Sequence, residues 1–120
     1  MTRPAISVRC YIPLNSVTRI IAYPVPRCDE AVGISFGGSQ WKWPMDTPFG
    51  YHQIRLDKAS QHKLATAGPN GTKYTSNVMP FGPVNSPVIF IIFIHDMNQR
   101  WQEVATSRGI AIDVATNTKL

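Results

Sequence analysis

The stretch NVMPFGPVNSPVIF, residues 77–90, decides the fold, because a loop rich in proline and glycine runs directly into an apolar block. Ser86 followed by Pro87 is a helix-start signal, with serine as the N-cap and proline in the first turn. The sequence therefore predicts a helix from Ser86 to about Arg100 or Glu103. Its first half is apolar on every side and is expected to be buried, whereas its end, HDMNQRWQE, is expected to lie in solvent. The β-branched residues of the block leave a strand as the alternative, but the run continues past strand length.

The segment before this loop predicts extended chain. YHQIRL, residues 51–56, alternates between two faces as a strand does. KLATAGPNGTKYTSNVM, residues 63–79, predicts a β-hairpin, because residues 68–71 (GPNG) supply the turn chemistry between two short strands.

The two ends of the chain predict only short elements. Four prolines in residues 1–30 exclude long helices and predict extended segments and turns. Residues 29–34 are predicted as a short helix capped by Asp29, Trp41 and Trp43 alternate as in a strand, and residues 110–114 are predicted as a strand. Together these elements predict an α+β fold in which antiparallel strands and a hairpin pack on a buried helix.

Composition limits the classes of protein. A chain of 120 residues predicts a single domain. Twelve Lys and Arg against seven Asp and Glu give a net charge of +5, which suits a polyanionic partner such as nucleic acid, although many small basic proteins have no such partner. Cys10 and Cys28 have no zinc spacing and are expected to be free, buried thiols.

Nothing in the sequence predicts a membrane segment. The N-terminus lacks the apolar core of a signal peptide, and the longest apolar run, VIFIIFI, is far shorter than the roughly 20 residues that span a bilayer. We therefore expect an intracellular protein, in the cytoplasm or the nucleus, and the sequence predicts no oligomeric state.

Asp46 is the first candidate for chemistry. It lies in MDTPFGYHQI, residues 45–54, after a predicted strand and before a turn. A carboxylate at a strand end suits Mg²⁺, which prefers oxygen ligands. One aspartate is a weak signal, and taken alone Asp46 is better explained as a solvated turn residue than as a metal ligand. A metal site at His95 and Asp96 is not expected, because adjacent residues on a helix point in different directions.

Three blocks of sequence, taken together, resemble one family. MDTPFGYHQI resembles the first catalytic motif of the reverse transcriptases of gypsy-type LTR retrotransposons, in which an aspartate lies four residues before Gly-Tyr-His-Gln-Ile. NVMPFGPVNSPVIF is similar to the second motif, Met-Pro-Phe-Gly-Leu-x-Asn-Ala-Pro. RCYIPLNSVTRIIAYPVPRCDEAV, residues 9–32, resembles the fingers-to-palm segment, with Leu14-Asn15, Val17-Thr18 and Tyr23-Pro24 at the family's spacing.

The resemblance implies RNA-directed DNA polymerase activity by two-metal nucleotidyl transfer, with Mg²⁺ as cofactor and template-primer and dNTP as partners. It implies that Asp46 and the Thr47 carbonyl bind metal. It also implies that Tyr51 is the steric gate against a ribose 2′-hydroxyl. The alternative for Tyr51 is an ordinary aromatic residue in the core or on the surface of a strand.

The second motif implies further site residues. Phe81 and Gly82 would line the pocket of the incoming nucleotide, and Gly82 would let the backbone come close to it. Asn85 and Ser86 would open the helix beneath the templating base pair. Lys63 and Lys73 flank the predicted hairpin and would contact phosphates, unless they simply form a solvated face.

The sequence also departs from the family. The third motif, Tyr/Phe-x-Asp-Asp, is missing, since no Asp-Asp pair occurs in the 120 residues, and Asp113 is a lone aspartate. The usual Asp-Tyr-Arg reads Cys10-Tyr11-Ile12, so the arginine that helps to hold the triphosphate is lost. We therefore expect a fragment of a palm that lacks the catalytic Asp-Asp hairpin, does not polymerise alone, and folds partially or aggregates.

The expected division is a fingers-to-palm remnant in residues 1–30, a palm with both motifs in residues 31–105, and a truncated tail in residues 106–120. Two other functions stay open. One is a non-catalytic nucleic-acid-binding remnant that uses Trp41, Trp43, Tyr51 and Tyr74. The other is an unrelated small α+β interaction protein.

Overall fold

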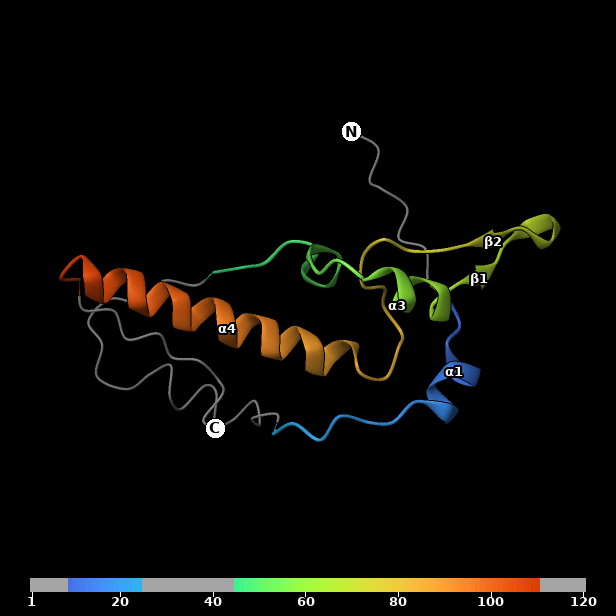
Figure 1. The fold of residues 1–120 in the computed structure, drawn as a ribbon, viewed down its shortest axis with the longest axis horizontal. Coiled ribbons are helices and arrows are strands. Elements are labelled where there is room, and N and C mark those ends of the chain that lie inside the picture. Colours follow the sequence, from blue (N-terminus) through green and yellow to red (C-terminus); the bar gives the residue numbers. More distant parts are fainter. Residues whose placement is uncertain (1–8, 25–44, 111–120) are drawn as a thin grey trace. The chain divides into compact units, whose positions relative to one another are not determined.

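The structure is a computed structural model, and it describes residues 9–24 and 45–110 (Figure 1). The chain divides into two compact units, residues 1–20 with 48–86 and residues 21–47 with 87–120. The first unit holds the helices α1 (Ile12–Val17) and α3 (Lys58–Lys63), the 3₁₀ turns η1 (Gly50–Gln53) and η2 (Pro69–Gly71), and the strands β1 (Thr66–Ala67) and β2 (Lys73–Tyr74). Helix α4 (Ser86–Ser107) begins at the last residue of the first unit and otherwise belongs to the second.

Helix α4 starts at Ser86, as the Ser-Pro signal predicts, and its 22 residues extend beyond the predicted end to Ser107. The chain leaves the helix through Gly109, which has a φ of 69°. There the Gly109 N–H donates to the Thr106 carbonyl and the Ile110 N–H to the Ala105 carbonyl, both at 3.0 Å. Glycine in a left-handed conformation is a common helix stop, because it has no Cβ to clash.

The expected burial of the apolar first half of α4 is wrong. Ile89 and Ile92 are 37% and 40% exposed, and within the described part of this helix only Ser86 and Ala105 are buried. The physical reason is that the block is apolar on every side, so full burial requires packing partners on all faces. The polar second half does reach solvent, since Trp101 is 54% exposed.

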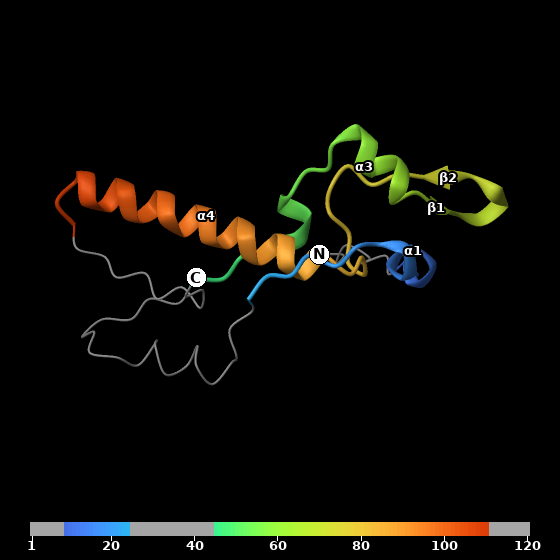
Figure 2. The same ribbon diagram turned by 60° about the horizontal axis from the view of Figure 1, so that its bottom comes forward.

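The hairpin predicted within residues 63–79 is confirmed, although its strands are only two residues long. β1 and β2 are antiparallel, with Thr66 opposite Tyr74 and Ala67 opposite Lys73. The turn is tight because Asn70 and Gly71 both have positive φ angles, 67° and 71°, and the Gly68 N–H donates to the Thr72 carbonyl at 2.7 Å. Figures 1 and 2 show this hairpin beside α3.

The strand predicted for residues 51–56 is wrong. The chain turns at Phe49, which has a φ of 53°, and enters η1. The His52 N–H donates to the Phe49 carbonyl at 2.8 Å, and the Gln53 side chain donates to the Pro48 carbonyl at 2.9 Å. These local bonds outweigh the alternating pattern, which survives only as a single bridge between Arg55 and Val78.

Two short helices were not predicted. Helix α1 starts with Pro13 in its first turn, a position that proline tolerates because its missing N–H would be unpaired there anyway. Helix α3 follows Asp57, which stands at the N-cap position, and Asp57 was the signal that could have found it. The prediction that long helices are absent near the N-terminus holds for residues 9–24.

The described core is small. In the first unit the buried apolar residues are Tyr11, Met79 and Pro80, and in the second unit Ala105 is buried. Cys10 is exposed, so the prediction of a buried thiol is wrong at this position. Cys28, the predicted helix at 29–34, the Trp41–Trp43 strand and residues 111–114 of the predicted tail strand lie outside the described residues.

The coarse fold class is confirmed, because the described residues combine helices with a small antiparallel sheet. Across residues 9–24 and 45–110, no helix has both the length and the apolar character needed to cross a membrane.

Candidate functional site

An aromatic cluster joins the two sequence motifs within the first unit. The rings of Tyr51 and Phe81 lie 4.8 Å apart between centroids and are tilted by 35°. His52 meets Phe81 edge-on at 5.3 Å and stacks with Phe49 at 6.4 Å. Pairs at these separations are favourable beyond the area that they bury. The structure therefore brings together two residues that sequence analysis assigned to one nucleotide pocket.

Backbone pairing explains how residues 30 positions apart meet. The bridge between Arg55 and Val78 is flanked by two hydrogen bonds, from the Leu56 N–H to the Asn77 carbonyl at 3.0 Å and from the Met79 N–H to the Ile54 carbonyl at 2.8 Å. This short antiparallel contact holds the end of η1 against the loop that precedes α4. Tyr51 lies three residues before Ile54 and Phe81 two residues after Met79, so the two residues follow the chain away from the same end of this contact.

Gly82 occupies a position that only glycine fits well. Its φ is 110°, a conformation that L side chains rarely adopt. A Cβ added there would lie 2.9 Å from Cδ2 of Tyr11 and 3.4 Å from the Arg9 carbonyl oxygen. The close approach that sequence analysis expected for a nucleotide is thus seen, in this structure, between Gly82 and the segment that precedes α1.

The Asn15 side chain fastens the Gly82 loop to α1. Its Nδ2 donates to the Gly82 carbonyl at 3.0 Å, and its Oδ1 accepts from the Val84 N–H at 2.9 Å. Sequence analysis assigned no site role to Asn15. The available signal was its place in Leu14-Asn15, one of the motif pairs of the resemblance.

Asn85 and Ser86 also make contacts within the first unit. The Asn85 Nδ2 donates to the Arg19 carbonyl at 2.9 Å. Ser86 is 2% exposed, and its hydroxyl donates to the Pro80 carbonyl at 3.2 Å. These bonds fix the start of α4 and the loop before it, and the predicted contact of both residues with nucleic acid stays a prediction.

Asp46 and Thr47 belong to the second unit, whereas Tyr51, Phe81 and Gly82 belong to the first. Asp46 is exposed and Thr47 half-buried. Over the described ranges no three His, Cys, Asp or Glu side chains gather where they could hold a metal ion. One carboxylate and one backbone carbonyl do not make up the ligand set of a Mg²⁺ site.

Lys63 ends α3 and Lys73 begins β2, and both side chains are exposed. Exposure fits a phosphate contact and a solvated face equally well. The structure therefore leaves both interpretations of these lysines open.

Comparison with known proteins places the motifs in context. The family described as reverse transcriptase (RNA-dependent DNA polymerase) matches residues 3–114. The retrovirus-related Pol polyprotein from transposon 297 of Drosophila melanogaster is 38% identical over 80 residues, which cover 67% of this chain and 7% of that protein. The transposon Tf2-3 polyprotein of Schizosaccharomyces pombe is 34% identical over 85 residues, which cover 71% of this chain and 6% of that protein.

The Pol polyprotein from transposon opus of Drosophila melanogaster is 34% identical over 84 residues, which cover 70% of this chain and 8% of that protein. The chain thus spans less than a tenth of the length of these relatives. No solved structure matches the chain.

Proposed function

Because this chain belongs to the reverse transcriptase family, we propose that it forms part of the RNA-directed DNA polymerase of a gypsy-type retroelement. In this proposal residues 31–105 form palm structure and residues 1–30 lead into it from the fingers. Members of the family bind a nucleic-acid template-primer and dNTPs and use divalent metal ions. Both the family match and the similarity to retrotransposon polyproteins support a resemblance between this chain and such a polymerase.

The contact between the Tyr51 and Phe81 rings is the observation that supports roles for individual residues in this proposal. Tyr51 is the proposed steric gate, whose ring fills the space of a ribose 2′-hydroxyl. A gate discriminates only if its ring cannot swing aside. Phe81 lies against that ring at 4.8 Å, and His52 in turn lies against Phe81. This packing supports the assignment of Tyr51 and Phe81 to one nucleotide pocket.

For the metal ions we propose Mg²⁺, with the Asp46 carboxylate and the Thr47 carbonyl among its ligands. The described residues do not complete that ligand set, and the sequence has no Asp-Asp pair. We therefore propose that the chain by itself does not polymerise. Incubation with Mg²⁺, dNTPs and a primed template is expected to give no extension, and Mg²⁺-dependent extension by the purified chain would refute this.

Nucleotide discrimination tests the gate without requiring polymerisation. We expect the chain to bind dUTP more tightly than UTP, from which dUTP differs only by the missing 2′-hydroxyl, and we expect the amides of residues 51–54 and 81–82 to shift in NMR spectra on dUTP addition. Tyr51→Ala should remove the preference, whereas Tyr51→Phe keeps the ring and should retain it. Equal binding of the two nucleotides by the unchanged protein, or a preference that survives in Tyr51→Ala, would sink the assignment.

A second candidate function is nucleic-acid binding without catalysis. It is favoured by the net charge of +5 and by the exposure of Lys63, Lys73 and Tyr74 around the hairpin. Such binding should weaken steeply with salt and should need no metal ion. Titration of a single-stranded oligonucleotide at two salt concentrations, with and without EDTA, separates this function from metal-dependent binding of dNTP.

A further inference from the structure

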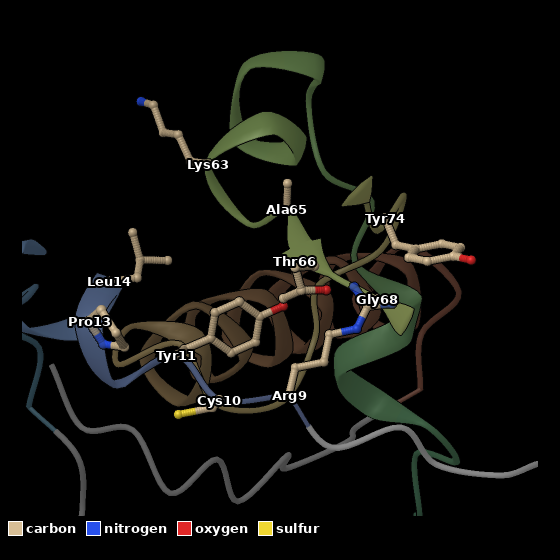
Figure 3. Close-up of a pocket in the computed structure, with 11 residues that line it drawn as sticks. Arg9, Cys10, Tyr11, Pro13, Leu14, Lys63, Ala65, Thr66, Gly68 and Tyr74 are labelled. Atoms are coloured by element: carbon tan, nitrogen blue, oxygen red, sulfur yellow. The ribbon is translucent and has the colours of Figure 1, made fainter. Parts of the chain in front are cut away.

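A cavity of about 670 Å³ lies within the first unit, between the segment before α1, the end of α3 and the hairpin (Figure 3). Volumes of this size are typical of small-molecule sites. Its walls include Arg9, Tyr11, Leu14, Lys63, Thr66 and Tyr74. Tyr51, Phe81 and Gly82 do not line it, so the cavity is separate from the proposed nucleotide pocket.

Arg9 carries the chemical argument. The Nη1 atom of its guanidinium is buried and has no hydrogen-bond partner in the described structure. A buried polar nitrogen without a hydrogen-bond partner is costly, and partial loss of water strengthens the attraction of the guanidinium for an anion. The positive charge is spread over the whole planar group. An anion bound at the edge of the guanidinium that faces the cavity would therefore also offset the cost of burying the Nη1 atom.

The other walls favour a phosphate. Lys63 adds a second positive charge at the rim, and none of the described residues that line the cavity is acidic. Figure 3 shows the Arg9 guanidinium close to Thr66 and Gly68, with the Lys63 ammonium at the other end of the site. The Thr66 hydroxyl is a further donor. Guanidinium and hydroxyl groups together are frequent phosphate ligands because their hydrogen bonds to it are charge-assisted.

The cavity is larger than an inorganic phosphate requires, and the remaining wall is aromatic and apolar. Tyr11 is 5% exposed, and its hydroxyl donates to the Leu64 carbonyl at 3.3 Å, so the ring forms a fixed wall of the cavity. Leu14 and Tyr74 also line the cavity, and Tyr74 is 50% exposed. An accessible tyrosine ring suits the face of a nucleobase.

We propose that this cavity binds a nucleotide, with the phosphate at Arg9 and Thr66 and the base against the exposed ring of Tyr74 and the side chain of Leu14. The nucleotide is either free in solution or one unit of a single strand, since both present a phosphate next to a base. The site is additional to the proposed polymerase pocket and does not rest on it, because the two share none of the residues that would contact the ligand.

Titration of the purified 120-residue chain with dAMP, adenosine, inorganic phosphate and an oligo(dT) tests the proposal. NMR amide shifts locate each ligand, and calorimetry gives its affinity. We expect dAMP to bind and to shift the amides of residues 65–68. Adenosine should bind more weakly because it lacks the phosphate. Tighter binding of the oligonucleotide at the same amides would identify a strand as the source, and tighter binding of dAMP would identify free nucleotide.

Variants separate the cavity from general basic charge. Arg9→Met removes the cation but keeps the length of the side chain, and it should weaken dAMP binding about tenfold or more, as expected for a lost charge-assisted hydrogen bond. Arg108→Met removes one positive charge from an exposed position beyond α4 and should leave the affinity unchanged. Lys63→Met should have a smaller effect than Arg9→Met.

The outcomes that overturn the proposal are equally specific. They are no binding of dAMP at millimolar concentration, equal affinities of Arg9→Met and the unchanged chain, or shifts confined to residues 51–54 and 81–82. The last result would place the nucleotide in the Tyr51–Phe81 pocket instead. If Arg9→Met alters the fold, Arg9→Lys retains the charge and should retain part of the binding. Failure of this inference leaves the Tyr51 test of the proposed function unaffected.

Discussion

Gly82 is the residue at which a single methyl group should cost most. Gly82→Ala places an L side chain at a φ of 110° and brings its Cβ to 2.9 Å from the buried Tyr11 ring. We expect a loss of about 1–3 kcal/mol in the free energy of unfolding. Gly71→Ala is the matched control, since its φ is 71° but nothing lies within 4 Å of the added Cβ. Chemical denaturation should therefore show that Gly82→Ala is less stable than Gly71→Ala. The reverse order would refute the close contact between Gly82 and Tyr11.

Asn15 is the second residue with a measurable structural role. Asn15→Ala removes two hydrogen bonds, which join α1 to Gly82 and Val84 at 3.0 and 2.9 Å. The bonds are partly exposed, so we expect a cost of about 1–2 kcal/mol. The exposed Asn77 makes no side-chain hydrogen bond in the described structure, and Asn77→Ala should cost much less. Similar unfolding midpoints for the two variants would show that Asn15 does not hold the loop.

At the scale of the element, α3 should respond to acid. The pKa of the Asp57 carboxyl lies below its ordinary value of 3.8, mainly through the Ser60 side chain and then through the first-turn amides. None of those amide N–H groups donates to the Asp57 carboxylate with ordinary hydrogen-bond geometry, so the interaction is weak. Because the pKa of Asp57 is lower in the folded state, the ionised carboxyl stabilises α3 above pH 3.8. This stabilisation is lost as the pH falls through the lowered pKa.

NMR chemical shifts of residues 58–63 between about pH 5 and about pH 2 measure this loss. We expect the helical shifts of α3 to decrease on acidification and Asp57→Asn to abolish most of that change. Asp96→Asn is the control, because Asp96 pairs with Arg100 at 3.0 Å on an exposed face of α4. An acid response of α3 that persists in Asp57→Asn would contradict the role of this carboxyl.

Elements with strong local signals were predictable, and those that depend on distant contacts were not. Ser86-Pro87 marks the start of α4 and Asn70-Gly71 marks the hairpin turn, and both signals act within a few residues. In contrast, η1 replaces the alternating strand because Phe49 adopts a left-handed conformation. Alternation alone did not reveal that turn, since it reports which faces are apolar and not where the backbone bends.

The candidate site shows the same division. The resemblance to reverse transcriptases singled out Tyr51 and Phe81, and the structure places their rings in contact. The Asn15 bonds to Gly82 and Val84 were not predictable, because they join positions that are nearly 70 residues apart. Hydrogen bonds between residues so far apart in the sequence depend on the tertiary fold that brings the two segments together, and no local sequence pattern predicts this.

At the scale of the whole molecule, exposed apolar side chains should dominate behaviour in solution. Ile12 and Val17 on α1 are 76% and 80% exposed. We expect the chain to bind a hydrophobic dye such as ANS, to unfold over a broad temperature range and to self-associate with increasing concentration. A sharp two-state melt of a monomer at high concentration would contradict this.

A double variant, Ile12→Thr with Val17→Thr, tests which surface is responsible. Both side chains already face solvent, so the replacement should reduce self-association, measured by light scattering, with little loss of stability. Met79→Thr is the contrasting control, since Met79 is 2% exposed and a buried hydroxyl without a partner should unfold the first unit. Unchanged light scattering by the double variant would show that the exposed side chains of α1 do not cause the self-association.

The Asn15 amide donates on one side and accepts on the other, and this polarity has a genetic consequence. Aspartate has nearly the same shape, but its carboxylate would turn an oxygen toward the Gly82 carbonyl, where Asn15 now presents an N–H. Both asparagine codons become aspartate codons through one A-to-G exchange. A single copying error at that base would thus replace an attraction by a repulsion while changing the side chain by only one atom. Position 15 is therefore one of the positions at which a single-base substitution should damage the protein as errors accumulate in its gene.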